Sequence, residues 1–107
     1  MRIIRNELII DDYQTITLPA SGKPLSVAQS RSAPNTLIDI WSYDFESGDP
    51  KSIGIYIVGT GHPMPSEIAM SAAMGGMGGL IPIPPPFLGT VVTPIGLVWH
   101  VFEGPVR

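Results

Sequence analysis

The sequence predicts an all-β protein: a small antiparallel sandwich or partly open barrel of about six strands with one short helix. Runs of β-branched and aromatic residues, several with strict alternation, favour strands over helices. The 12 glycines and 12 prolines punctuate these runs and are typical of turns. A chain of 107 residues is long enough for a single hydrophobic core, so we expect one domain over residues 1–107.

The first half of the chain contains four strand-like runs. Residues 3–10 and 14–18 surround the Asp11-Asp12 pair, which suits a turn, and predict a first hairpin or a bent strand. Residues 25–29 alternate in a half-buried pattern, and residues 36–43 carry β-branched and aromatic side chains. In this last run, one predicted face holds Leu37, Asp39, Trp41 and Tyr43, and the other holds Ile38 and Ile40.

The most strand-like run of the chain is Ser52–Val58. Its three isoleucines point one way, and Gly54, Tyr56 and Val58 point the other, so we expect a central strand that is covered on both faces. Gly54 has no side chain and therefore allows another segment to approach closely.

One helix and a closing hairpin are predicted in the second half. Residues 65–74 contain good helix formers, with Pro65 and Glu67 near the start and Gly75 as a stop. Residues 87–93 and 95–102 then form a hairpin about Thr93-Pro94.

Composition excludes several classes of function. The formal charge is −3, and the six Lys and Arg residues are scattered, so bulk nucleic-acid binding is not expected. Without cysteine there is no disulfide, thiolate metal site or cysteine nucleophile. The sequence carries no metal-ligand repeat and no cofactor motif, so no metal ion or cofactor is assigned.

The location of the protein is inferred from two segments. Arg5, Asn6 and Glu7 interrupt the apolar N-terminal run, so we expect no secretory signal and a cytoplasmic protein. Residues 68–92 form an uncharged segment that is long enough to cross a bilayer as a helix, but its glycines and prolines would leave backbone groups without hydrogen bonds in lipid. We therefore expect no membrane span.

The candidate ligand site is the loop that leaves the central strand. Gly59, Thr60 and Gly61 can present backbone amides to a phosphate or another anion, and His62 follows directly. The loop lacks the Walker and dinucleotide fingerprints, and a purely structural turn is the alternative. From the closing strand, Trp99 and His100 join the predicted ligand-binding set. The aromatic residues can stack on a base, or they can simply fill a β core.

A catalytic role would depend on the two histidines. Imidazole is the usual acid or base, yet no serine elbow, carboxylate pair or metal site completes a mechanism. A histidine in an alternating strand, such as His100, is commonly structural. We therefore assign no catalytic residue and expect a protein that is not an enzyme.

Self-association is predicted from the distribution of charge. No Asp, Glu, Lys or Arg lies between Glu67 and Glu103, which would leave a monomer of this size with a large apolar patch. Methionines in this stretch suit an adaptable interface, although a lid helix over the sheet is the alternative. The predicted homo-oligomer interface comprises Ile68, Met70, Met74, Met77, Leu80, Ile83 and Phe87.

Three segments resemble a known group of proteins. Ile-Tyr-Ile-Val-Gly-Thr-Gly-His-Pro-Met-Pro at 55–65, Leu-Gly-Thr at 88–90 and Leu-Val-Trp-His-Val-Phe-Glu at 97–103 are similar to short, uncharacterised phage and prophage proteins. The likeness extends to the runs at 14–16 and 25–27, whereas residues 70–86 form a longer segment than the family would lead us to expect. The resemblance implies a phage setting but no reaction.

Together these observations favour a non-enzymatic, homo-oligomeric binding protein of phage type. It would sequester a small anionic, nucleotide-like ligand and so counter host defence signalling. One alternative is an inhibitor that docks on a host defence enzyme through an exposed sheet edge or the Met/Pro-rich segment. The other is a hydrolase that acts on a nucleotide signal through His62.

Overall fold

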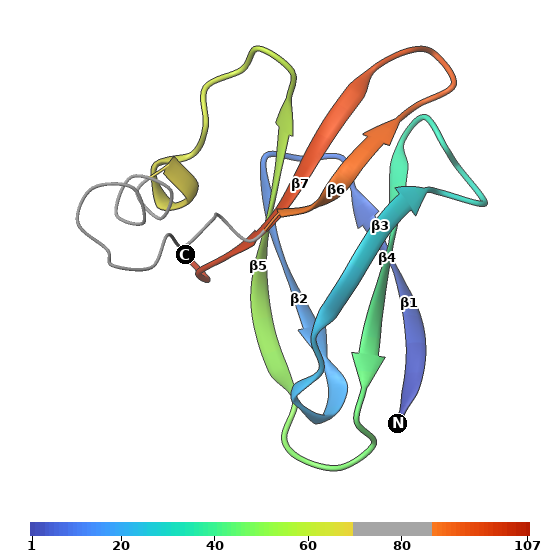
Figure 1. The fold of residues 1–107 in the computed structure, drawn as a ribbon, viewed down its shortest axis with the longest axis vertical. Helices are drawn as coiled ribbons and strands as arrows, with labels where there is room; N and C mark the ends of the chain where they lie inside the picture. The colour runs from blue at the N-terminus through green and yellow to red at the C-terminus, as the bar shows by residue number, and fades with distance from the viewer. Residues whose placement is uncertain (70–86) are drawn as a thin grey trace.

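A computed structural model describes residues 1–69 and 87–107 (Figure 1). These residues form two antiparallel sheets of three and four strands, a short 3-10 turn, and a helical stretch at 66–69, which confirms the predicted fold class. The elements are β1 (Arg2–Ile9), β2 (Tyr13–Leu18), η1 (Pro19–Ser21), β3 (Pro24–Gln29), β4 (Leu37–Asp44), β5 (Lys51–Gly59), β6 (Phe87–Val92) and β7 (Val98–Gly104).

The strand order is β1-β4-β3 in one sheet and β2-β5-β7-β6 in the other. The two sheets share one core, and at one side of it β3 and β6 lie side by side (Figure 1). There the Gln29 side-chain amide donates to the Val92 carbonyl at 2.8 Å. A Cβ on Gly89 would lie 3.0 Å from the side chain of Val27, so a glycine permits the approach. Because no backbone ladder joins β3 to β6, the architecture is a partly open sandwich and not a closed barrel.

The first two strands do not form a hairpin. β1 pairs with β4, and β2 pairs with β5, so the chain crosses from one sheet to the other at residues 10–12 and the bent-strand interpretation is correct. Each strand thereby buries a leucine, Leu8 or Leu18, in the core between the sheets. The Gln14 side chain stabilises the corner, because its amide both donates to the Ile9 carbonyl and accepts from the Ile9 N–H.

β5 is central to its sheet, as predicted, and lies between β2 and β7. Ile53, Ile55 and Ile57 face the main core between the sheets, and Tyr56 and Val58 are buried on the opposite face. The close approach predicted at Gly54 is confirmed. A Cβ there would lie 2.5 Å from the carbonyl oxygen of Pro105, so the segment after β7 crosses this strand at backbone distance.

A second apolar cluster covers the outer face of β5 and includes Ile68. This side chain is only 1% exposed and packs with Tyr56, Val58 and Phe102. Its burial depends on Gly104, since a Cβ there would lie 2.9 Å from Ile68 Cδ1. The sequence assigned Ile68 to a subunit interface, but the structure places it inside the chain's own core.

The other predicted interface residues have different outcomes. Phe87 is half exposed, and its ring centroid lies 5.3 Å from that of Phe102. The second half of the predicted helix, residues 70–74, lies outside the described residues, as do these predicted interface residues: Met70, Met74, Met77, Leu80 and Ile83. Among the residues that are described, no helix is long and apolar enough to cross a membrane.

Glu67 and Arg107 tie the end of the chain to the helical residues. Arg107 Nε donates to Glu67 Oε2 at 2.7 Å, and its backbone N–H donates to the Tyr13 hydroxyl at 2.8 Å. The guanidinium also lies 4.8 Å from the Tyr13 ring centroid and 5.3 Å from that of Tyr56. The Tyr56 hydroxyl donates its proton to the Pro105 carbonyl, and its oxygen lies 3.3 Å from Glu67 Oε2. This tether, defined by Glu67, Arg107 and the two tyrosines, holds Ile68 against β5.

The tether predicts a specific acid sensitivity. Hydrogen bonding from Arg107 lowers the pKa of Glu67 from 4.5 to about 2. A depressed pKa stabilises the folded state above the unfolded pKa, and this contribution disappears as pH falls from 4.5 towards 2. The melting temperature of the wild type should therefore fall more steeply over that interval than that of Glu67→Gln, which cannot titrate. Parallel slopes in differential scanning calorimetry would contradict this assignment.

Candidate functional site

The loop that follows β5 is a tight, well-defined turn. The His62 N–H donates to the Gly59 carbonyl at 3.0 Å, and Gly61 has a φ of +84°. Backbone of this kind is open to glycine at little cost and strained for a residue with a Cβ. The backbone conformation of the turn therefore requires a glycine at position 61. Space is not the reason, since a Cβ built there would have no heavy atom within 4 Å.

Gly59 supports the ring of His62. A Cβ at this position would lie 2.8 Å from His62 Nδ1 and 3.4 Å from Trp99 Cζ3, so the imidazole rests directly on the glycine beside the indole. The pairing of β5 with β7 explains the placement, because Gly59 is the register partner of Trp99. Three of the predicted site residues thus come together at the end of β5.

His100 has a different position from His62. Its Nε2 is 2.8 Å from Thr60 Oγ1, and its Nδ1 is 2.9 Å from Thr90 Oγ1. Each hydroxyl can donate or accept, so the neutral ring satisfies both threonines in either tautomer. His100 thereby connects the loop to β6 and β7, and its two ring nitrogens are already engaged. The structure brings Thr60 and His100 together as an anchor of the loop.

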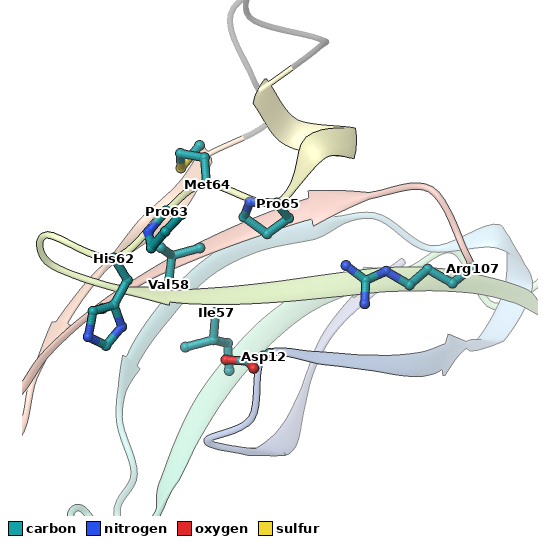
Figure 2. A pocket seen from close by; sticks show the side chains of 9 residues that line it. Asp12, Ile57, Val58, His62, Pro63, Met64, Pro65 and Arg107 are labelled. Atoms are coloured by element: carbon teal, nitrogen blue, oxygen red, sulfur yellow. The ribbon is translucent and has the colours of Figure 1, made fainter.

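Two pockets meet at His62. The first, of about 390 Å³, extends under the loop and includes Asp12 and Arg107 in its lining. Figure 2 shows His62 and Arg107 at the two ends of this pocket, with Asp12 between them and Pro63, Met64 and Pro65 along one wall. The second, of about 230 Å³, lies against the β6–β7 turn and is lined by Gly96, Leu97, Val98 and Trp99. Both pockets are bordered by Gly59 and His62.

The charged residues of the first pocket were not identified from the sequence. Asp12 belongs to a turn, and Arg107 is far from it in the chain. The fold places Asp12 there through its carbonyl, which accepts from the Ile57 N–H at 3.3 Å, and places Arg107 there through Tyr13. Local patterns do not report such contacts, because both depend on strand register. In the described ranges, no group of three acidic or histidine side chains is positioned to hold a metal ion.

A second charged cluster lies on the outer face of β4 and has a structural explanation. Asp39 is 1% exposed, and its carboxylate accepts from Arg5 Nη1 at 3.0 Å, with Arg31 Nε at 3.8 Å. Arg31 in turn lies 5.6 Å from the ring centroid of Trp41. Burial of a charged carboxylate costs free energy unless positively charged or hydrogen-bonding groups lie beside it. The cluster compensates the buried charge of Asp39, which gives these two arginines a structural explanation.

The chain belongs to a family defined by a domain of unknown function, DUF7352, whose model matches residues 1–107. No curated protein and no solved structure matches the chain.

Proposed function

We propose that this DUF7352 protein is a non-enzymatic binding protein that sequesters a small anionic, nucleotide-like ligand where its two pockets meet. The observation that carries the proposal is the position of His62, which rests on Gly59 and borders both pockets. The first pocket is within the usual range for small-molecule sites, and the second extends it at the shared residues.

The two pockets offer complementary chemistry. In the second pocket, Leu97 and Trp99 provide an apolar and aromatic surface suited to a base. In the first, His62 and Arg107 Nη1 can donate to a phosphate, because Glu67 accepts from Arg107 Nε and Nη2. The Asp12 carboxylate there can accept from hydroxyl or amino groups of a ligand. A ligand that carries an anion together with hydrogen-bond donors fits this pocket better than a bare polyanion, which Asp12 would repel. Nucleotides have this combination.

Binding is favoured over catalysis because a single histidine is available. Both ring nitrogens of His100 contact threonines, so His62 would have to supply proton transfer alone. The phage origin, and with it the host-cell cytoplasm as location, rests on the sequence resemblance. The role against host defence signalling is part of the proposal and depends on the identity of the ligand. Homo-oligomer formation is supported by the lack of charge between Glu67 and Glu103, whereas Ile68 itself packs in the chain's own core.

The substitution His62→Ala separates sequestration from hydrolysis. One hydrogen bond to a charged group contributes about 1.5–3 kcal/mol, so retention of the ligand should weaken by roughly tenfold to a hundredfold. Heating the wild-type complex should release a chemically intact ligand, identified by mass spectrometry of the supernatant. Asp49→Ala, in the exposed β4–β5 loop, is the control and should retain the ligand as the wild type does.

Two outcomes would overturn the proposal. A hydrolysed nucleotide released from the wild type but not from His62→Ala would make the protein a hydrolase. A preparation that binds no nucleotide, but binds a purified host defence enzyme and inhibits it, would make the protein an inhibitor of that enzyme.

A further inference from the structure

Among residues 1–69 and 87–107, β1 is an edge strand whose backbone is unpaired on one side. It pairs with β4 on one side, and its continuation, β2, belongs to the other sheet (Figure 1). In an antiparallel ladder, alternate residues turn their N–H and C=O groups towards the neighbouring strand. Just beyond β1, Ile10 donates to the Thr36 carbonyl in the same register, so the even-numbered residues bond to β4. The odd-numbered residues Ile3, Arg5, Glu7 and Ile9 therefore face the open edge.

One end of this open edge is already closed. The Gln14 side chain bonds both the N–H and the C=O of Ile9, as a neighbouring strand would. Ile9 is odd-numbered, so this bond agrees with the alternation of backbone N–H and C=O directions along β1. Among the described residues, the outward N–H and C=O groups of Ile3, Arg5 and Glu7 have no backbone partner. Unpaired edges of this kind are templates for another strand.

We propose that a second copy of this chain pairs antiparallel with β1, with Asn6 on the two-fold axis. In this register, Arg5 lies opposite Glu7 of the partner subunit, and the reverse pair follows by symmetry. Both residues face the open edge, so each pair exchanges both backbone hydrogen bonds. The inference is independent of the ligand site and concerns a surface other than residues 68–87.

Charge selects this register over its neighbours. A two-fold centred on Arg5 would oppose two arginines, and one centred on Glu7 would oppose two glutamates. Like charges directly opposite destabilise a sheet, whereas opposite charges stabilise it. Only the register centred on Asn6 pairs each arginine with a glutamate across the axis.

The ladder in this register is short. The Gln14 side chain occupies the edge beside Ile9, so the backbone bonds of the pairing are those of the two Arg5–Glu7 pairs. Asn6 Oδ1 is buried without a hydrogen-bond partner among the described residues, although such an atom normally has one. At the axis, where opposed side chains are closest, the amide of Asn6 of the partner subunit can reach it.

Amide hydrogen exchange measured by NMR tests the pairing directly. Asn6 and Leu8 donate to β4 in any state and should exchange slowly at all protein concentrations. The amides of Arg5 and Glu7 should exchange rapidly at low concentration and become protected by at least tenfold when sedimentation shows a dimer. Rapid exchange of these two amides in a demonstrated dimer would overturn the proposal, as would a monomer at millimolar concentration.

A charge reversal provides the second readout. Glu7→Lys sets like charges against Arg5 of the partner subunit and should raise the dimer dissociation constant at least tenfold. Asp49→Lys makes the same change of charge in the exposed β4–β5 loop and should leave the constant within twofold of the wild-type value. Equal effects of the two substitutions would show a general response to charge and would refute the β1 register.

Discussion

Replacement of Gly59 by alanine is expected to lower ligand affinity roughly tenfold to a hundredfold, as the loss of His62 would, while leaving both sheets intact. The new methyl group would lie 2.8 Å from His62 Nδ1, so the imidazole must leave its position between the two pockets. The strand backbone itself can accommodate alanine, and the effect should therefore be local. Isothermal titration with the nucleotide identified from the purified protein measures it.

A remote glycine provides the control for this substitution. Gly48 has a φ of +112° and lies in the β4–β5 loop, so Gly48→Ala introduces backbone strain away from the two pockets. It should reduce the melting temperature without changing ligand affinity. An affinity of Gly59→Ala within threefold of the wild type would show that the position of His62 does not matter for binding.

The substitution Ile68→Ala is expected to reduce the free energy of unfolding by about 2–5 kcal/mol, the usual range when a buried isoleucine side chain is truncated. The physical reason is the loss of contacts with Tyr56, Val58 and Phe102 under the helical residues. Urea denaturation at a fixed protein concentration measures the change. Ile95→Ala is a matched control, because Ile95 is 65% exposed, and it should alter stability by less than about 0.5 kcal/mol.

The same two variants also distinguish whether Ile68 is a core residue or a subunit contact. If Ile68→Ala dissociated an oligomer while costing no more stability than Ile95→Ala, Ile68 would be a subunit contact, as its sequence context suggested. The structure favours the core, since Gly104 is required to leave room for this side chain.

Periodicity predicted most of the strands because each β-rich run has its own alternating pattern and its own turn. The central position of β5 was predicted from the apolar residues on both of its faces, and the close approach at Gly54 from its lack of a side chain. For the connection between β1 and β2, the sequence allowed either a hairpin or a bent strand. Strand partners depend on contacts with β4 and β5, which the sequence of residues 3–18 does not encode locally.

The loop was identified from its glycines and histidine, but the composition of the pocket was not. Asp12 and Arg107 reach the loop only through the pairing of distant strands and through the Tyr13 hydroxyl. A structural, hydrogen-bonded His100 was the alternative that its alternating strand favoured, but its partners Thr60 and Thr90 were not predicted, because they depend on strand pairing. The sequence predicted that Ile68 is buried, but it did not predict which residues bury it. A subunit interface and a second core within the chain have the same local pattern of apolar residues.

The most direct test of the proposed function is native mass spectrometry of the wild-type protein expressed in cells that produce nucleotide signals. The sequestration proposal predicts a mass excess that matches one nucleotide-like ligand per chain, recovered intact on denaturation and strongly reduced in Gly59→Ala. A wild-type protein that carries no such ligand, and acquires none when incubated with a panel of nucleotides, would contradict it.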